Sequence, residues 1–219
     1  MRFRIKSVKL KELLNENHSF GKHIYYGSLW GVGTGYLLPI LIGVFNLNNS
    51  AVGNYSLALN FIIPLTFLPS ILGTSYYKSF IKAEAIPFKT IRFTIIISII
   101  LLLLVLFGID ILIKIFLDQR FSEVGVLVKI GSISAIFHGF GDFINKFLSA
   151  KGQGSYIKKV AIYVGVIQLV ASLFLIHLFS STGAMIAKSI GSLVYFIALF
   201  IFYYNNYQIR KFKVFFKLS

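Results

Sequence analysis

The chain lacks cysteine and is poor in acidic residues. Its 219 residues contain no cysteine and only seven Asp or Glu, against 22 Lys or Arg. The missing thiols exclude disulfides, thiolate chemistry and cysteine-ligated metals. The scarce carboxylates form no paired-acid or nucleophile–base pattern, so we expect no enzyme. Four widely spaced His residues predict no metal site.

A nucleotide-binding motif is also missing. The run Gly31-Val32-Gly33-Thr34-Gly35 has the spacing G-x-G-x-G and lies inside an apolar segment with no strand before it. We therefore expect no cofactor. Gly27, Gly31 and Gly35 instead predict a small-residue face for close helix packing.

Apolar side chains are what the chain has in excess. Hydrophobic residues make up 57% of the sequence and charged residues 13%, which is far from the balance of a soluble domain. The apolar runs predict an all-α polytopic membrane protein, because helices satisfy their own backbone groups in lipid. The six predicted transmembrane helices are Ile24–Phe45, Ala51–Phe80, a helix with the core Phe93–Leu106, Val124–Ser149, Val160–Phe179 and Ala184–Tyr204. Pro64 and Pro69 predict a kink in the second helix.

Basic residues alternate along this map. Eighteen of the 22 fall before the first helix, between helices two and three, between helices four and five, or after the last. By the positive-inside rule both termini are then cytoplasmic, and the net charge of +15 needs no nucleic-acid partner. No secretory signal peptide is expected. The predicted organisation is a basic cytoplasmic segment (1–23), a six-helix transmembrane lobe (24–205) and a basic tail (206–219) on the membrane surface.

The fourth predicted helix carries a stripe of small and polar residues. Its members recur at alternating spacings of four and three: Gly131, Ala135, His138, Asp142, Asn145 and Ser149. Asp142 can also pair with Lys146 at a spacing of four. Two interpretations stay open, a structural ion pair within a packing seam or the wall of a polar cavity.

The sixth predicted helix carries Lys188 at membrane depth. It shares a face with Ala184, Ala187, Gly191 and Tyr195. A central Lys costs about 2.5 to 3.5 kcal/mol on the insertion scale, so such residues usually face a partner or a wet cavity. The alternative is that Lys188 snorkels to the outer interface.

Two further features concern charges near the outer ends of helices. Lys129 lies on the opposite side of its helix from His138, and we expect it to snorkel. Asp110 and Lys114 are spaced for an ion pair on the surface of one helix. Both are interpreted as structural.

Three segments resemble a known family. Residues 51–59, AVGNYSLAL, with Pro64 further along a long helix, are similar to the "VGxYSLA" segment of polysaccharide flippases. Residues 148–159, LSAKGQGSYIKK, resemble the family's connection between two late helices, and residues 181–203 resemble the last helix of one half. The family is the O-antigen and capsule flippase branch of the multidrug/oligosaccharidyl-lipid/polysaccharide exporter superfamily.

The resemblance implies two six-helix lobes around a central cavity that opens alternately to each side of the bacterial cytoplasmic membrane. The cargo would be an undecaprenyl-pyrophosphate-linked oligosaccharide for cell-surface polysaccharide. This chain resembles only the C-terminal lobe, so it is a fragment or assembles with a second copy or another half. A pyrophosphate needs cationic partners, for which we expect Lys188 and Lys146. The expected sugar or headgroup contacts are His138, Asp142, Asn145, Gln168 and Tyr195.

Two other functions stay open. The first is a cation-coupled small-molecule exporter of the same superfamily, in which Asp142 would carry the coupling ion. The second is a membrane scaffold without transport activity, whose helices merely pack. The polar faces of helices four and six favour a transporter.

Overall fold

A computed structural model describes residues 10–11, 14–15, 17–46, 49–117 and 121–208. Within these residues the secondary structure is helical, with no strand. The long helices are α2 (Lys22–Phe45), α3 (Asn49–Ser75), α5 (Phe88–Phe116), α6 (Ser122–Ala150) and α7 (Gly154–Tyr203). The short α4 (Tyr77–Lys82) lies between α3 and α5, and the π-helical turns η1 (Asn17–Gly21) and η3 (Tyr204–Gln208) precede α2 and follow α7. Each long helix is long and apolar enough to cross a membrane. The predicted all-α polytopic membrane fold is confirmed.

The helix α7 is a hairpin of two membrane-spanning halves. Its 50 residues include Ser180, whose φ of 52° and ψ of −131° break the helix. The Tyr156 hydroxyl donates to the Ala198 carbonyl over 3.0 Å, and its ring stacks on Phe202 at 3.9 Å between centroids. The first half (154–179) and the second half (181–203) therefore run antiparallel and correspond to the fifth and sixth predicted helices. With α7 divided in this way, the bundle contains six helical segments that are long enough to cross a membrane.

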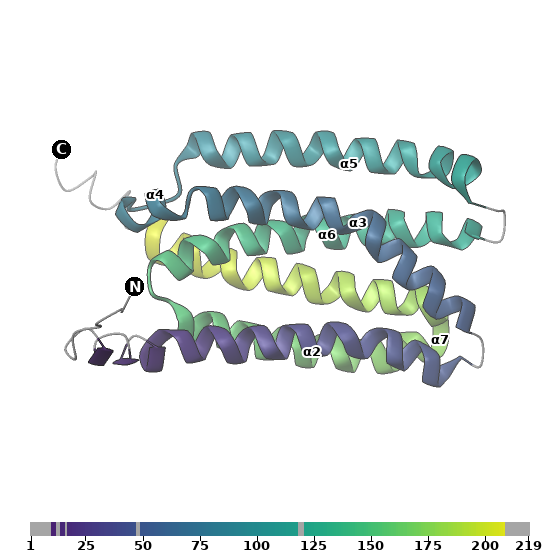
Figure 1. Ribbon diagram of the computed structural model, residues 1–219, viewed down its shortest axis with the longest axis horizontal. Helices are drawn as coiled ribbons and strands as arrows, with labels where there is room; N and C mark the ends of the chain where they lie inside the picture. The colour runs from purple at the N-terminus through teal and green to yellow at the C-terminus, as the bar shows by residue number, and fades with distance from the viewer. Residues whose placement is uncertain (1–9, 12–13, 16, 47–48, 118–120, 209–219) are drawn as a thin grey trace, which may run out of the picture.

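The second predicted helix differs in length from the structure. The second predicted helix, Ala51–Phe80, is divided into α3 and α4 at Tyr76, whose φ of −89° and ψ of 2° are not helical. Two prolines lie inside α3, and Figure 1 shows α3 bending along its length. The third predicted helix agrees with α5, which contains the apolar core 93–106 and also Asp110 and Lys114 near its far end.

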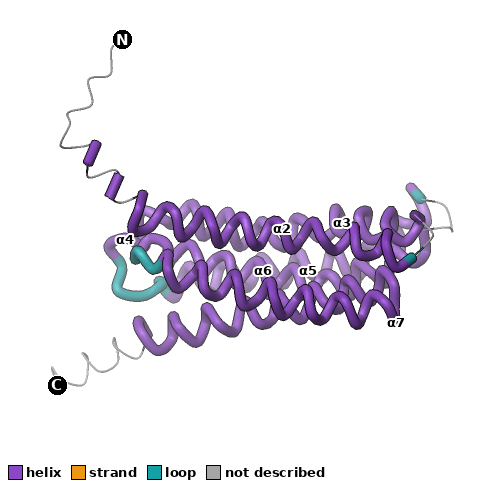
Figure 2. Tube along the Cα trace, turned by 90° about the horizontal axis from the view of Figure 1, so that it is seen from below, coloured by secondary structure: helices purple, strands orange, loops and turns teal. Residues whose placement is uncertain are grey.

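The helix α6 lies at the centre of the bundle. It packs against α3, α5 and the second half of α7, while α2 packs against the first half of α7 (Figure 1). The helix α5 lies at the edge. Figure 2 shows that α2 begins, α7 ends and the loop after α4 turns at the same end of the bundle. We call this the basic end, because the lysines of the α3–α5 and α6–α7 connections lie there, and the opposite one the far end.

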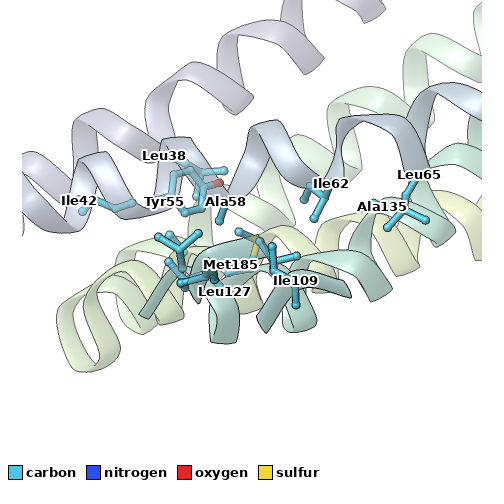
Figure 3. Close-up of a cluster of buried hydrophobic side chains, with 14 of the residues drawn as sticks. Leu38, Ile42, Tyr55, Ala58, Ile62, Leu65, Ile109, Leu127, Ala135 and Met185 are labelled. Carbon is cyan, nitrogen blue, oxygen red and sulfur yellow. The ribbon is translucent and has the colours of Figure 1, made fainter. Parts of the chain in front are cut away.

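The main apolar core fills the half of the bundle toward the far end. Figure 3 shows side chains of α2, α3, α5, α6 and α7 meeting there. Its labelled members are Leu38, Ile42, Tyr55, Ala58, Ile62, Leu65, Ile109, Leu127, Ala135 and Met185. A second cluster joins α4, α6 and the second half of α7 near the basic end, where the Phe80 ring packs edge-on against Phe143 and Phe147. Between this cluster and α2 the packing is incomplete.

Candidate functional site

A cavity of about 460 Å³ lies between α2, α6 and the two halves of α7. It extends from Ile24 in the first turn of α2 and Ser149 in the last turn of α6 to Thr34, His138 and Gln168 deeper in the bundle. The cavity therefore occupies the half toward the basic end. The helices α2 and α3 meet in the far half, where Gly43 faces Val52, and Figure 1 shows them separating toward the basic end, which leaves room for the cavity.

Six of the seven residues predicted from the sequence line this cavity. Four lie on α6 and one on each half of α7: His138, Asp142, Asn145, Lys146, Gln168 and Tyr195. The α6 residues converge because their spacing of three or four places them on one helix face. Gln168 and Tyr195 reach the same space because α7 folds back on itself.

The predicted α6 stripe divides into two parts. From His138 to Ser149 it is cavity wall. Further toward the far end it is a packing seam, since a Cβ at Gly131 would lie 2.8 Å from the Met185 sulfur, and Ala135 is buried in the main core. A packing seam therefore describes the far half of this stripe, and a cavity wall describes the basic half.

The polar residues of the cavity form a chain of hydrogen bonds in which each residue donates to the next. Ser149 Oγ donates to Asn145 Oδ1 over 3.0 Å, and Asn145 Nδ2 donates to the Tyr195 hydroxyl over 2.7 Å. The Tyr195 hydroxyl donates to Asp142 Oδ1 over 3.0 Å. The His138 ring stacks on Tyr195 with centroids 5.1 Å apart. Tyr195 is therefore the centre of the network, and Gly141 makes room for its ring.

The expected ion pair between Asp142 and Lys146 is not formed. Among the described residues, the Lys129–Asp110 contact of 2.7 Å is the one salt bridge within 4.0 Å. Asp142 is held by Tyr195 instead, and the stem of Lys146 lies against α3, where a Cβ at Gly73 would be 3.0 Å from Lys146 Cγ. The cavity thus contains an acidic and a basic group that do not neutralise each other directly.

The same contact changes the interpretation of the outer charges. Asp110 on α5 pairs with Lys129 on α6 rather than with Lys114 on its own helix. Lys129 therefore does not simply extend to the interface. The pair joins two neighbouring helices, a contact that spacing along one helix does not reveal.

Lys188 does not line the cavity. It lies on the second half of α7, between Met185 in the main core and Gly191 at the cavity wall. Its side chain is half-buried, and its charge acts on the His138 ring. Within the described part of the chain it has no hydrogen-bond or salt-bridge partner. The role of Lys188 at the inner limit of the cavity stays a prediction.

The small-residue face predicted on α2 packs in only one place. A Cβ at Gly27 would lie 3.3 Å from the Lys158 Cα, so α2 and α7 approach closely there. A Cβ added at Gly31 or at Gly35 would meet nothing within 4 Å, and Gly31 faces the cavity.

A polar contact at the far end was missed by the sequence analysis. Asn54 Nδ2 on α3 donates to Glu123 Oε2 over 2.8 Å, and Ser181 Oγ, beside the break in α7, donates to Glu123 Oε1. One carboxylate in the first turn of α6 therefore holds three helices together. An acidic residue in a first helical turn is a general signal, but its partners lie 69 and 58 residues away and leave no local pattern.

Comparison with models of protein families, with curated proteins and with solved structures finds no match for this chain.

Proposed function

We propose that the chain forms one lobe of a transporter that moves an undecaprenyl-pyrophosphate-linked oligosaccharide across the bacterial cytoplasmic membrane, with its basic end in the cytoplasm. The polar cavity at membrane depth is the observation that carries the proposal. The resemblance of residues 51–59, 148–159 and 181–203 to polysaccharide flippases supports the choice of substrate.

The composition of the cavity suits this substrate. Ionisable residues inside a membrane are expensive and usually serve a water-filled path or a bound ligand. Asn145, Gln168 and Ser149 offer the donors and acceptors that sugars need. Lys146 lies at the wall and Lys188 at the inner limit, where cations would stabilise a pyrophosphate.

The walls of the cavity suit one lobe of a larger assembly. Gly31 lines the cavity, yet a Cβ at this position would meet nothing within 4 Å. The polar side chains face this open space from α6 and α7. A second six-helix half or a second copy of the chain would supply the opposing wall.

The test is the leaflet location of lipid-linked oligosaccharide in cells that lack the protein and are then given a variant. Lys146→Ala and Lys188→Ala should each leave product on the cytoplasmic leaflet at unchanged protein level. Lys129→Ala is the matched control, because it removes the same charge outside the cavity. Normal export with both of these lysine variants would contradict the roles of the two lysines, and normal export without the protein would contradict the function.

A second candidate function rests on Asp142. Its carboxylate accepts from a tyrosine hydroxyl and, among the described residues, forms no salt bridge. An intramembrane carboxylate without a fixed cation suits a coupling proton or metal cation. In a cation-coupled exporter, Asp142→Asn would abolish gradient-driven efflux, whereas a flippase without such coupling would retain oligosaccharide export.

A further inference from the structure

We propose that the groove between α2 and the first half of α7 binds one anionic glycerophospholipid from the leaflet at the basic end. This site is separate from the polar cavity. It combines an apolar groove for an acyl chain with a cluster of cationic side chains for the headgroup.

The groove has a volume of about 630 Å³ and lies on the outer face of the α2–α7 seam. It is lined by Tyr26, Leu29, Trp30, Gly33, Thr34, Leu37, Lys158, Ile162 and Leu169. The surface that these residues present to the groove is almost entirely carbon. The one charged member, Lys158, lies at the basic end. Thr34 lines both the groove and the polar cavity and is the one lining residue that the two have in common.

The length of the groove fits one leaflet. Tyr26 and Leu37 mark its limits along α2, and a rise of about 1.5 Å per residue places them about 17 Å apart. This is about half of a hydrocarbon core of about 30 Å. A phospholipid chain of one leaflet matches this span, whereas a 55-carbon polyprenyl chain exceeds it.

Two lysines and two histidines gather at the basic end of the groove. Lys22 Nζ lies 3.2 Å from His18 Nδ1, and the His23 ring interacts electrostatically with Lys158, Lys22 and His18. The backbone of Lys158 is fixed against α2 at Gly27, one turn beyond His23. We call the charged Lys22 and Lys158, together with the neighbouring imidazoles of His18 and His23, the cation cluster.

The cation cluster has no anionic partner among the described residues. His23 Nδ1 is buried and makes no hydrogen bond. Basic groups between helices on the cytoplasmic side are suited to anionic lipid headgroups, whose phosphate accepts from such donors. The charge complementarity and the one-leaflet groove together select an anionic glycerophospholipid.

Trp30 provides a direct readout, because it is the only tryptophan in the chain and it lines the groove with 39% of its surface exposed. The purified full chain is placed in phosphatidylcholine nanodiscs that contain a small fraction of lipid with brominated chains, which quench tryptophan on contact. Brominated phosphatidylglycerol should quench Trp30 more strongly than the same fraction of brominated phosphatidylcholine.

Variants separate the headgroup from the groove. Lys158→Ala and Lys22→Ala should each lower the preference for phosphatidylglycerol about fivefold, while Lys159→Ala, next to Lys158 but outside the groove, should retain it. Gly33→Phe should fill the groove and abolish the preference, because a Cβ there meets nothing within 4 Å. Gly53→Phe, equally open but on α3, is its control.

Equal quenching by the two brominated lipids in the unmodified chain would overturn the proposal. Stronger displacement of brominated phosphatidylglycerol by undecaprenyl phosphate than by unlabelled phosphatidylglycerol would also overturn it, because the occupant would then be a polyprenyl lipid. Neither result depends on transport, so the proposed function is tested separately.

Discussion

The two halves of the bundle are built from the same helices but packed differently. Toward the far end, side chains from α2, α3, α5, α6 and α7 fill the interior, and Glu123 joins three helix ends. Toward the basic end, α2 separates from α3 and a polar cavity lies between α2, α6 and α7. The difference teaches that polarity and packing change together along each helix, so the bundle is closed at one end and hollow at the other.

The helix α6 shows this change within one face. Gly131 is a contact point for Met185, whereas Asp142, about three turns later, faces the cavity and bonds to Tyr195. The proposed transporter lobe, if open at its basic end, would have this asymmetry. Four substitutions, ordered by expected effect, test whether the far half carries the stability of the fold.

The turn in α7 should be the most sensitive position. In Gly183→Leu, the added Cβ would overlap the Leu175 carbonyl and prevent the hairpin from closing. We expect little or no monodisperse protein after extraction into detergent, measured by size-exclusion chromatography. Gly31→Leu, at an open position of the basic half, should give the yield of the unmodified chain. Equal losses for both variants would contradict the contrast between the halves.

Removing apolar packing from the far half should come next. Leu127 is completely buried in the main core, whereas Leu104 on α5 is 64% exposed. Leu127→Ala should lower the free energy of unfolding by about 2–5 kcal/mol, because a cavity is left behind, and Leu104→Ala should change it little. Reversible unfolding in mixed micelles measures both. A similar loss of unfolding free energy for the two variants would show that the buried contacts of α6 in the main core do not stabilise the fold as the structure indicates.

Removing the Glu123 carboxylate should have an intermediate effect. It should be visible as greater access of a thiol reagent to the interior of the far half. Glu123→Ala leaves Asn54 and Ser181 without their acceptor. Because the chain has no cysteine, Ser132→Cys provides a single probe at a buried position of the far half. A membrane-impermeant thiol reagent should label it roughly tenfold faster or more in the Glu123→Ala background, given the loss of hydrogen bonds to a charged group.

The controls for this labelling lie in the basic half. Ser149→Cys, at the cavity wall, should react in both backgrounds. Glu84→Ala removes an exposed carboxylate near the basic end and should leave Ser132→Cys unreactive. Labelling of Ser132→Cys at the same rate with and without Glu123 would mean that this carboxylate does not hold the far end closed.

The exposed ion pair should have the smallest effect. The side chains of Lys129 and Asp110 are 46% and 56% exposed, and exposed pairs contribute about 0–1 kcal/mol. Lys129→Ala should therefore shift thermal unfolding only slightly. A loss as large as that of Leu127→Ala would show that charges rather than apolar packing hold α5 to α6.

The helices could be predicted from the sequence because their signals are local. Apolar runs long enough to span lipid predict the five long helices, and SSTG at 180–183 marks the turn of α7. The spacing on α6 also predicted that its small and polar residues share one face, but it left open whether this face packs against a helix or lines a cavity. The predicted length of the second helix was wrong, since the break at Tyr76 has neither Pro nor Gly to signal it.

Contacts between helices could not be predicted in the same way. The spacing rules paired Asp142 with Lys146 and Asp110 with Lys114. In the structure Asp142 instead accepts from Tyr195, and Asp110 pairs with Lys129. Both partners lie on other helices. Rotation and crossing of helices decide such pairs, and neither is set by the periodicity of a single segment.

The sequence by itself determined that this is an all-α membrane protein, because lipid allows few ways to satisfy a polar backbone. It also determined which residues are too polar to face lipid. Only the tertiary structure decided that the α6 stripe is seam in one half and cavity in the other. The physical reason is that burial depends on which helix lies opposite, and this is fixed by the divergence of α2 from α3 and the hairpin at Ser180.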